Sequence, residues 1–260
     1  MTRKTLTEGT QESLKGASGR RIAFFGGSFD PPHLGHLAVA RAAQTALGLD
    51  TVLFAPVGAQ PLKAQGATAG FEDRLAMTRL AIAGEPGFEI SLADAPMASG
   101  GPNYTLETLE RLHQKLAGSA LFLLMGADSF FSLRHWHRAA EIPFAAPLIV
   151  ASRPGQSLQG VKAALPRGLE MEAVDGGNPA PGGVEVREFL LRNEAGEAAN
   201  FYLLPGLDIR ISASEIRELL RIRELLRIQE LPRPAAGAAE ALAWLPDAVA
   251  RYVEEHGLYR

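Results

Sequence analysis

The hydrophobic positions of the first half of the chain form short apolar runs that alternate with segments of helical periodicity. Apolar runs lie at 21–25, 51–56 and 88–93, and helical patterns at 37–48 and 73–84 separate them. Alternation of strand and helix patterns at this spacing is typical of βαβ units that build a parallel sheet.

Two later apolar runs contain almost no polar alternation. They are "ALFLLMG" at 120–126 and "PLIVAS" at 147–152, and a helical pattern at 104–116 precedes them. Strands that are apolar on both sides are covered by helices on both faces of their sheet. The pattern therefore predicts an α/β fold with a doubly wound, Rossmann-like parallel sheet.

The organisation of the whole chain follows from length and composition. At 260 residues it can form one domain, which we place at 20–260, after a polar tail at 1–19 that is expected to be disordered. Residues 154–200 are rich in Gly, Pro and Ala, and we interpret them as an insertion or long excursion with a mobile tip. Within it, "VEVREFLL" and "NFYLLP" predict a strand pair.

A helical part follows at about 212–260. It contains the tandem copy "IRELLR" at 216–221 and again at 222–227. Six residues turn a helix by about 600°, so the second apolar stripe lies about 120° from the first. That second stripe either widens the buried face or contacts another copy of the chain in a homo-oligomer. The last helix, from Pro246 to a cap at Gly257, is expected to dock on the domain and to carry no chemistry.

Charge and cysteine content exclude several classes of function. The 26 basic and 29 acidic residues form no block of like charge, so composition does not support binding to nucleic acid or to a membrane surface. The chain has no cysteine, which excludes a disulfide scaffold and a thiolate nucleophile. Neither a secretory leader nor an apolar run of about 18 residues is present, so we expect a soluble, cytoplasmic protein.

The densest candidate chemistry follows the first predicted strand, in "GGSFDPPHLGH" at 26–36. Glycines allow close approach of the backbone to a ligand, and the start of a helix favours phosphate. His33 and His36 share one face of the first helical turn, where two imidazoles suit phosphoryl oxygens. A metal site would need a third ligand, and simple capping does not account for the accompanying glycines and prolines.

The motif resembles the signature of nucleotidyltransferases with paired histidines, and specifically of the bacterial nicotinate mononucleotide adenylyltransferases. The resemblance extends from residue 20 to 260. The other segments that resemble the family are "DRLAMTRLAI", "NYTLETL", "LLMGADSFFSLRHWHRAAEI", "ASRPG", "ISASEIR" and "LPDAVARYVEEHGLY". It implies a reaction of ATP with nicotinate mononucleotide that gives pyrophosphate and nicotinate adenine dinucleotide, as a step in NAD biosynthesis.

The resemblance also implies the residues that bind ATP. His33 and His36 contact the phosphates in this reading, and the backbone of the turn supplies a cradle; the residues of that cradle are Gly26, Gly27, Ser28 and Phe29. Phe29 suits the core equally well. Arg217 joins the histidines as a catalytic residue, next to Ser212 and Ser214 at a helix start.

Further adenosine contacts are expected after the fourth strand. Gly126 and Asp128 would face the adenosine, although an aspartate there could instead cap the next turn. The serines near Arg217 have a similar alternative, because Ser212 could be a simple helix cap. Ala213 stands where the family motif has a hydroxyl residue, so we expect one phosphate hydrogen bond of the family to be absent.

The mononucleotide is expected at the other end of the site. Trp136 would stack on the pyridine ring, although tryptophan also suits a core, and the turn at Asn103, Tyr104 and Thr105 would donate backbone N–H groups to the nicotinate carboxylate. Arg153 resembles a family arginine near the mononucleotide and could equally be a surface residue.

One segment departs from the family pattern. The family sequence Pro-Pro-His-Lys is replaced by Gln60-Pro61-Leu62-Lys63. Leu62 cannot donate a hydrogen bond, so we expect a weaker hold on the mononucleotide, with Lys63 compensating.

Metal is implied only through ATP. Mg²⁺ would bridge phosphate oxygens without a dedicated protein cage. Two alternatives to the main function stay open: transfer to nicotinamide mononucleotide or another phosphate ester, and a nucleotide-binding regulator without turnover.

Overall fold

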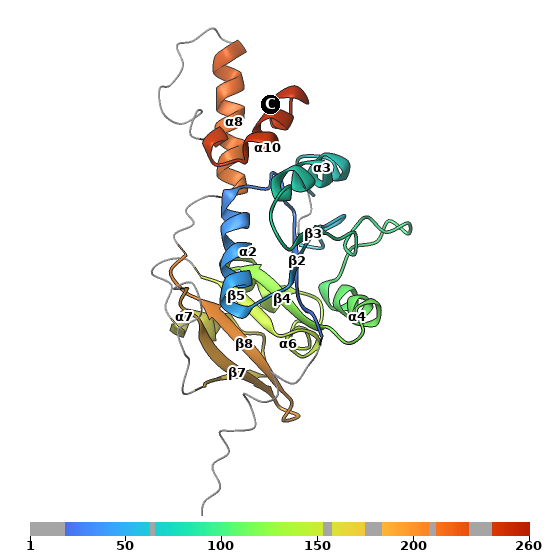
Figure 1. Cartoon of the computed structure of the whole chain (residues 1–260), viewed down its shortest axis with the longest axis vertical. Helices are drawn as coiled ribbons and strands as arrows, with labels where there is room; N and C mark the ends of the chain where they lie inside the picture. The colour runs from blue at the N-terminus through green and yellow to red at the C-terminus, as the bar shows by residue number, and fades with distance from the viewer. Residues whose placement is uncertain (1–18, 63–65, 153–157, 175–183, 208–211, 229–240) are drawn as a thin grey trace, which may run out of the picture.

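The computed structural model describes residues 19–62, 66–152, 158–174, 184–207, 212–228 and 241–260 (Figure 1). The expected polar tail therefore lies outside the described residues, apart from Gly19. The strands are β1 (Arg21–Gly27), β2 (Thr51–Pro56), β3 (Phe88–Ile90), β4 (Ala120–Gly126), β5 (Leu148–Ala151), β6 (Leu169–Ala173), β7 (Arg187–Asn193) and β8 (Ala198–Leu204). The helices are α2 (Leu34–Leu47), α3 (Phe71–Ile82), α4 (Thr105–Lys115), α5 (Ala127–Ser132), η1 (Leu133–His135), α6 (Ile142–Ala145), α7 (Leu158–Ala164), α8 (Ala213–Ile228) and α10 (Asp247–Glu255).

Within the described residues, eight strands form one sheet in the order β3-β2-β1-β4-β5-β8-β7-β6. The strands from β3 to β8 in this order run parallel. Only the edge formed by β7 and β6 is antiparallel. The predicted doubly wound fold is confirmed, and the chain reverses its direction of growth between β1 and β4.

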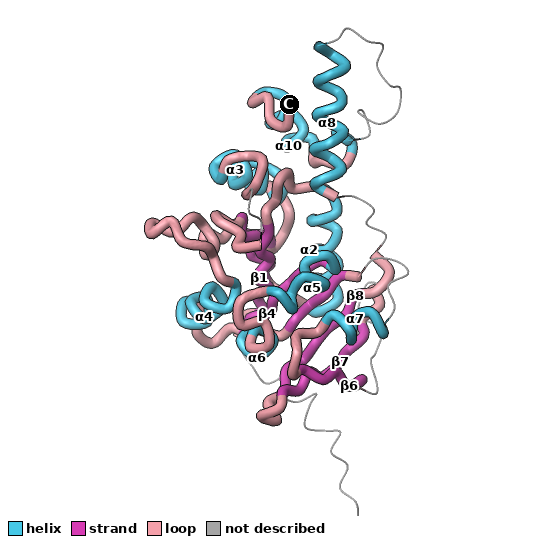
Figure 2. The backbone as a smooth tube through the Cα atoms, turned by 180° about the vertical axis from the view of Figure 1, so that it is seen from behind, coloured by secondary structure: helices cyan, strands magenta, loops and turns pink. Residues whose placement is uncertain are grey.

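The strands are buried on both faces, as their unbroken apolar sequence predicts. Alternate residues of each central strand belong to two separate cores. In β4, for example, Leu121 and Leu123 face one core, and Phe122 and Leu124 face the other. Residues of α4, α5, α6 and α7 cover the first core, and residues of α2 cover the second (Figures 1 and 2).

The predicted strand pair after residue 183 is confirmed as the antiparallel pair β7–β8. These strands continue the main sheet, because β8 also pairs in parallel with β5. The sequence did not predict α7 or β6, which precede the pair. Most of the Gly-rich segment "VDGGNPAPGG" lies outside the described residues.

A third apolar cluster joins α3, α8 and α10 beyond the end of the sheet. From the first "IRELLR" copy, Ile216 and Leu220 are buried in this cluster. Ile222 and Leu225 of the second copy are 39% and 49% exposed, on the part of α8 that extends away from the sheet in Figure 1. The contact with another copy of the chain stays a prediction. None of the helices in the described ranges is long and apolar enough to cross a membrane.

Candidate active site

A cavity of about 530 Å³ opens at the carboxyl ends of β1 and β4. This is the point where the strand order reverses, and adjacent crossovers leave a crevice there in doubly wound sheets. The β1–α2 loop, the α5 turn after β4 and the N-terminal end of α8 all line the cavity. Its position and size suit a nucleotide.

The glycines at this edge keep the cavity open. At Gly26, a Cβ atom would lie 3.0 Å from the ring of Phe24 and 3.4 Å from Asp94 Oδ2, so a side chain there would be crowded. At Gly126, a Cβ would meet no atom within 4 Å. Because Gly126 lines the cavity, any larger side chain would occupy ligand space.

The paired histidines lie at the start of α2, as predicted. His33 is the N-cap with extended backbone, and its N–H donates to Nδ1 of His36 at 3.1 Å. A neutral imidazole that accepts at Nδ1 carries its proton at Nε2. Burial, followed by the charge of His33, lowers the pKa of His36 well below 6.5. His36 is therefore a neutral hydrogen-bond donor whose tautomer the helix cap fixes.

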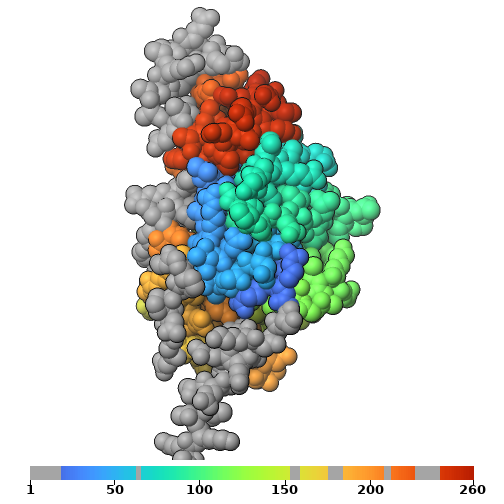
Figure 3. Space-filling view, viewed as in Figure 1, coloured from blue at the N-terminus to red at the C-terminus, as the bar shows by residue number. Residues whose placement is uncertain are grey.

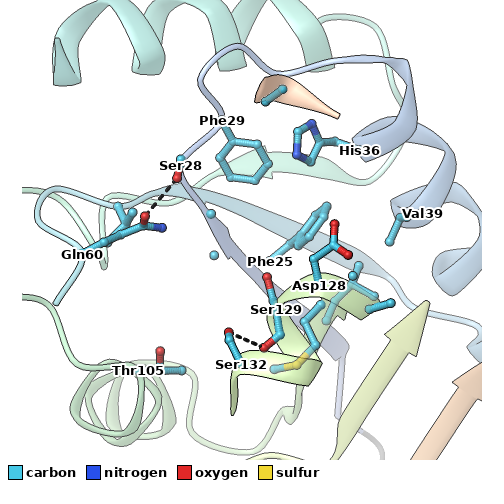
Figure 4. A pocket seen from close by; sticks show the side chains of 18 of the residues that line it. Phe25, Ser28, Phe29, His36, Val39, Gln60, Thr105, Asp128, Ser129 and Ser132 are labelled. Carbon is cyan, nitrogen blue, oxygen red and sulfur yellow. Dashed lines mark hydrogen bonds between the residues drawn. The ribbon is translucent and has the colours of Figure 1, made fainter. Parts of the chain in front are cut away.

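Phe29 supports the histidine pair from the core. It is buried, and its ring lies 5.0 Å from that of His36 and 5.5 Å from that of Phe25, edge-on in both cases (Figure 4). Its φ of 46° lies in the left-handed region, which costs about 1–3 kcal/mol for a residue with a side chain. The side chain of Phe29 is therefore part of the core, which is one of the two roles that the sequence allows.

The N-terminal end of α8 lines the same cavity as the histidines. Ser212 caps this helix, because its Oγ accepts the N–H of Glu215 at 3.2 Å. Arg217 donates from Nη1 to the carbonyl of Asp30 at 2.6 Å and from Nη2 to Ser214 Oγ at 3.3 Å. Two hydrogen bonds thus fix the guanidinium beside the β1–α2 loop, with further N–H groups left for a ligand.

Aromatic side chains line the opposite end of the cavity. The indole of Trp136 is half-buried and donates to Ser132 Oγ at 3.1 Å, which fixes its ring. Tyr104 lies against His137, with ring centroids 4.5 Å apart. Thr105 begins α4, so the first N–H groups of that helix lie at this end.

Asn103, in the same turn, serves the loop structure. Its N–H donates to the carbonyl of Ala59, its Oδ1 accepts the N–H of Ala59, and its Nδ2 donates to the carbonyl of Ala95. The expectation that the Asn103 N–H receives a carboxylate is therefore wrong in this structure, because that N–H is already engaged.

Asp94 is a buried acid in the cavity wall. It is 5% exposed and accepts a hydrogen bond from Thr108 Oγ1 at 2.6 Å. Burial raises its pKa to about 6, against the opposing effects of the Thr108 hydrogen bond and the charge of Arg111. Part of the Asp94 population is therefore protonated near neutral pH.

The segment that departs from the family pattern, residues 60–63, lies in part at the rim of the cavity. Leu62 lines the cavity and is 55% exposed. Gln60, two residues earlier, accepts a hydrogen bond from Ser28 Oγ at 3.1 Å (Figure 4). This bond ties the rim to the glycine turn. Lys63 and Arg153 lie outside the described residues.

Comparisons with known proteins place the chain in a family. Residues 24–219 match the cytidylyltransferase-like family. A protein of Gloeobacter violaceus named "Probable nicotinate-nucleotide adenylyltransferase" is 34% identical over 241 residues, covering 93% of this chain and 97% of the relative. One of the same name from a Roseiflexus species is 36% identical over 239 residues, covering 92% and 98%. The chain belongs to the nicotinate-nucleotide adenylyltransferase family.

A solved structure supports the fold independently. It is the Plasmodium falciparum nicotinic acid mononucleotide adenylyltransferase complexed with NaAD, with a TM-score of 0.62 at 15% identity. The match covers 92% of this chain and 97% of that one. At such low identity the likeness shows the shared fold of this adenylyltransferase family.

The cavity of this adenylyltransferase-family chain brings together nearly all of the site residues that the sequence predicts. Those that line it are Gly26, Gly27, Ser28, Phe29, His33, His36, Tyr104, Thr105, Gly126, Asp128, Trp136, Ser212, Ser214 and Arg217. Asp128 lies in the first turn of α5, directly after β4. No cluster of three metal-binding side chains occurs within the part of the chain that the structure describes.

Sequence reasoning missed several residues around the cavity. Asp94 lines it without belonging to a recognised motif, and Gln60 and His137 line it although the family segments that contain them gave these two residues no role. Arg74 is buried behind it and donates to the carbonyls of Ser28, Val57 and Ala69. The available signal was the position of Arg74, the first of two arginines in "DRLAMTRLAI", next to apolar residues of the predicted helix.

Proposed function

We propose that this chain transfers the adenylyl group of ATP to nicotinate mononucleotide, giving nicotinate adenine dinucleotide and pyrophosphate for NAD biosynthesis. The observation that carries the proposal is that His33, His36 and Arg217 line one cavity, with Arg217 bonded to the loop that leads to the histidines. Imidazole and guanidinium groups that line one cavity suit the oxygens of a polyphosphate. The family membership agrees with this reading.

The reaction needs positioning and charge stabilisation. A phosphate oxygen of nicotinate mononucleotide attacks the α-phosphorus of ATP in line with the leaving group. The bond from that phosphorus to the bridging oxygen of the β-phosphate breaks, and pyrophosphate leaves with its electron pair. No covalent intermediate with the protein is required.

The histidine pair and Arg217 act on the charge that develops during this step. His36 presents an N–H at Nε2, because its Nδ1 accepts the His33 N–H. A neutral donor can stabilise phosphoryl oxygens without giving up its proton. Arg217 adds a permanent positive charge, and the capped N-terminal end of α8 adds the helix dipole.

The two ends of the cavity suit the two substrates. Open space at Gly126 and the carboxylate of Asp128 suit the ribose and base of ATP. At the other end, the fixed indole of Trp136 suits the pyridine ring, and the start of α4 at Tyr104 and Thr105 offers N–H donors to the nicotinate carboxylate. We include Lys63 and Arg153 as mononucleotide contacts on the family resemblance alone.

Mg²⁺ enters with ATP in this proposal. The carboxylate of Asp30 is engaged by protein donors, so we do not assign it to the ion. A hard cation of this kind is well served by phosphate oxygens and water. The ion would neutralise phosphate charge, while the residues named above orient the substrates.

Pyrophosphate release tests the proposal directly. The purified chain is incubated with ATP, Mg²⁺ and nicotinate mononucleotide, and controls omit the mononucleotide or the protein. We expect release that depends on all components. Release no faster than in the controls would reject the proposed function and favour a regulator without turnover.

The start of α4 also favours nicotinate over nicotinamide mononucleotide. Backbone N–H donors bind a carboxylate through charge-assisted hydrogen bonds, whereas an amide brings its own N–H donors to the same place. We expect kcat/KM for nicotinate mononucleotide to be at least about 10-fold higher. Equal kcat/KM values for the two mononucleotides would show that the site does not recognise the carboxylate.

A further inference from the structure

The C-terminal segment, residues 241–260, contacts the β1–α2 loop from outside the cavity. After α10, Gly257 adopts a φ of 61°, which lets the chain reverse direction. Tyr259 then becomes buried, with 7% of its surface exposed. Figure 3 shows this segment in red, packed against the blue and teal residues of the N-terminal half.

Tyr259 is bonded to the loop that carries the phosphate-binding turn. Its hydroxyl donates to Asp30 Oδ1 at 2.8 Å. The same carboxylate accepts the N–H groups of Thr68 at 2.6 Å and Ala69 at 3.0 Å. Burial and the nearby charge of Asp30 raise the pKa of Tyr259, so its hydroxyl stays a donor. Three donors from two distant parts of the chain therefore fix one buried carboxylate.

Asp30 also fixes Arg217, through its main chain. Its carbonyl accepts the Arg217 Nη1–H at 2.6 Å, while Oδ2 lies 3.8 Å from the same nitrogen. The carboxylate and the carbonyl belong to one residue, so a shift of the carboxylate changes the position of the carbonyl. Tyr259 and Arg217 are thus connected through Asp30.

Two further observations support a functional connection. Phe29, which precedes Asp30, and Tyr259 both have positive φ, 46° and 62°. Side-chain-bearing residues persist in this conformation only where their surroundings hold them, and they cluster at functional sites. In addition, the N–H of Leu34 donates to the carbonyl of Trp244 at 2.9 Å. The C-terminal segment therefore holds the loop on both sides of His33.

We propose that Tyr259 is a positioning residue, which acts through Asp30 to hold Arg217 and the β1–α2 loop in the geometry that the reaction needs. The proposal rests on the proposed function for its kinetic effect. It replaces the expectation that the last helix and its end only dock on the domain. Without the tyrosine hydroxyl, the buried carboxylate of Asp30 loses one of its three hydrogen-bond donors and shifts toward the two that remain. That shift displaces the Asp30 carbonyl and, with it, Arg217.

Tyr259→Phe removes only the hydroxyl, and Tyr252→Phe is a matched control. Tyr252 belongs to the same segment and also donates to a carboxylate, Asp73 Oδ1, at 3.0 Å. Asp73, unlike Asp30, does not line the cavity. We expect kcat to fall about 10-fold in Tyr259→Phe, with both KM values within threefold, and to stay unchanged in Tyr252→Phe. Equal kcat in the two variants would overturn the proposal.

A double variant asks whether the effect passes through Arg217. If it does, adding Tyr259→Phe to Arg217→Lys lowers kcat by less than twofold beyond Arg217→Lys alone. A further 10-fold loss would contradict the connection, because it would show that the two residues act independently.

A crystal structure of Tyr259→Phe supplies a readout that does not need turnover. We expect the Asp30 carbonyl to move and Arg217 Nη1 to lose its hydrogen bond to it. An unchanged loop with Arg217 still bonded to Asp30 would overturn the proposal. If the unmodified chain releases no pyrophosphate, the proposed function fails, and this structural comparison still decides the role of Tyr259.

Discussion

His36 offers a substitution that separates its two ring nitrogens. Nδ1 accepts the N–H of His33 and closes the first turn of α2, and Nε2 is the group proposed to face phosphate. In His36→Asn, the amide oxygen takes the place of Nδ1, while nothing replaces Nε2–H. In His36→Gln, the amide nitrogen reaches toward the place of Nε2, and the bond to His33 is lost.

In His36→Asn, the structure predicts a small loss of folding stability and a large loss of kcat. The variant keeps the helix cap and loses the ring contacts with Phe29 and Phe25, which contribute about 0.5–1.5 kcal/mol. For a chain of this size, that loss lowers Tm by roughly 1–6 °C. Removal of a donor that stabilises transition-state charge lowers kcat by about 100- to 1,000-fold.

The assay combines steady-state kinetics with thermal unfolding. We expect His36→Asn to be folded at the assay temperature and to lose kcat by at least about 100-fold. His36→Gln should recover part of that kcat while having the lower Tm, since it lacks the cap. If His36→Asn keeps kcat within threefold of the unmodified chain, the Nε2–H is not part of the mechanism.

Three other substitutions test separate parts of the account. Arg74→Lys cannot make all three buried bonds to Ser28, Val57 and Ala69, so urea unfolding should show a loss of about 3 kcal/mol or more, and a loss below 1 kcal/mol would contradict its structural role. Because the pKa of Asp94 is raised from 3.8 to about 6, the folded chain loses stability as pH rises from about 4 to about 6, and the loss is constant above that; Asp94→Asn should therefore gain up to about 3 kcal/mol relative to the unmodified chain between pH 4 and pH 7. A pH-independent difference between the two unfolding curves would refute that assignment. Leu62→His places a donor at the exposed rim and should lower KM for nicotinate mononucleotide by about 3- to 10-fold without changing KM for ATP, whereas an unchanged KM would show that this position does not contact the mononucleotide.

Local patterns in the sequence were sufficient for the sheet and for the centre of the site. Alternate residues of the central strands are buried in two different cores, so both faces of these strands must be apolar. This requirement produces the unbroken apolar runs from which the strands are predicted. The glycines and histidines at 26–36 could be assigned because strand, turn and helix follow one another directly in the chain. The cap of α8 by Ser212 was equally local, and its side chain bonds where the pattern indicated.

The parts that were missed depend on contacts between distant residues. Tyr259 and Asp30 are 229 positions apart, and no local pattern connects them. The raised pKa of Asp94 arises from burial by the folded chain. The engagement of the Asn103 N–H by Ala59 likewise needs two loops to meet. Composition favoured an excursion at 154–200, yet β8 lies within the sheet because its apolar residues complete both cores.

We propose direct adenylyl transfer to nicotinate mononucleotide at the cavity by the carboxyl ends of β1 and β4. The most direct measurement uses nicotinate mononucleotide whose phosphate carries oxygen-18, with ATP and Mg²⁺, and mass spectrometry of both products. Direct transfer gives nicotinate adenine dinucleotide that retains the label, with unlabelled pyrophosphate. Label in the pyrophosphate, or no dinucleotide despite a folded chain, would contradict it.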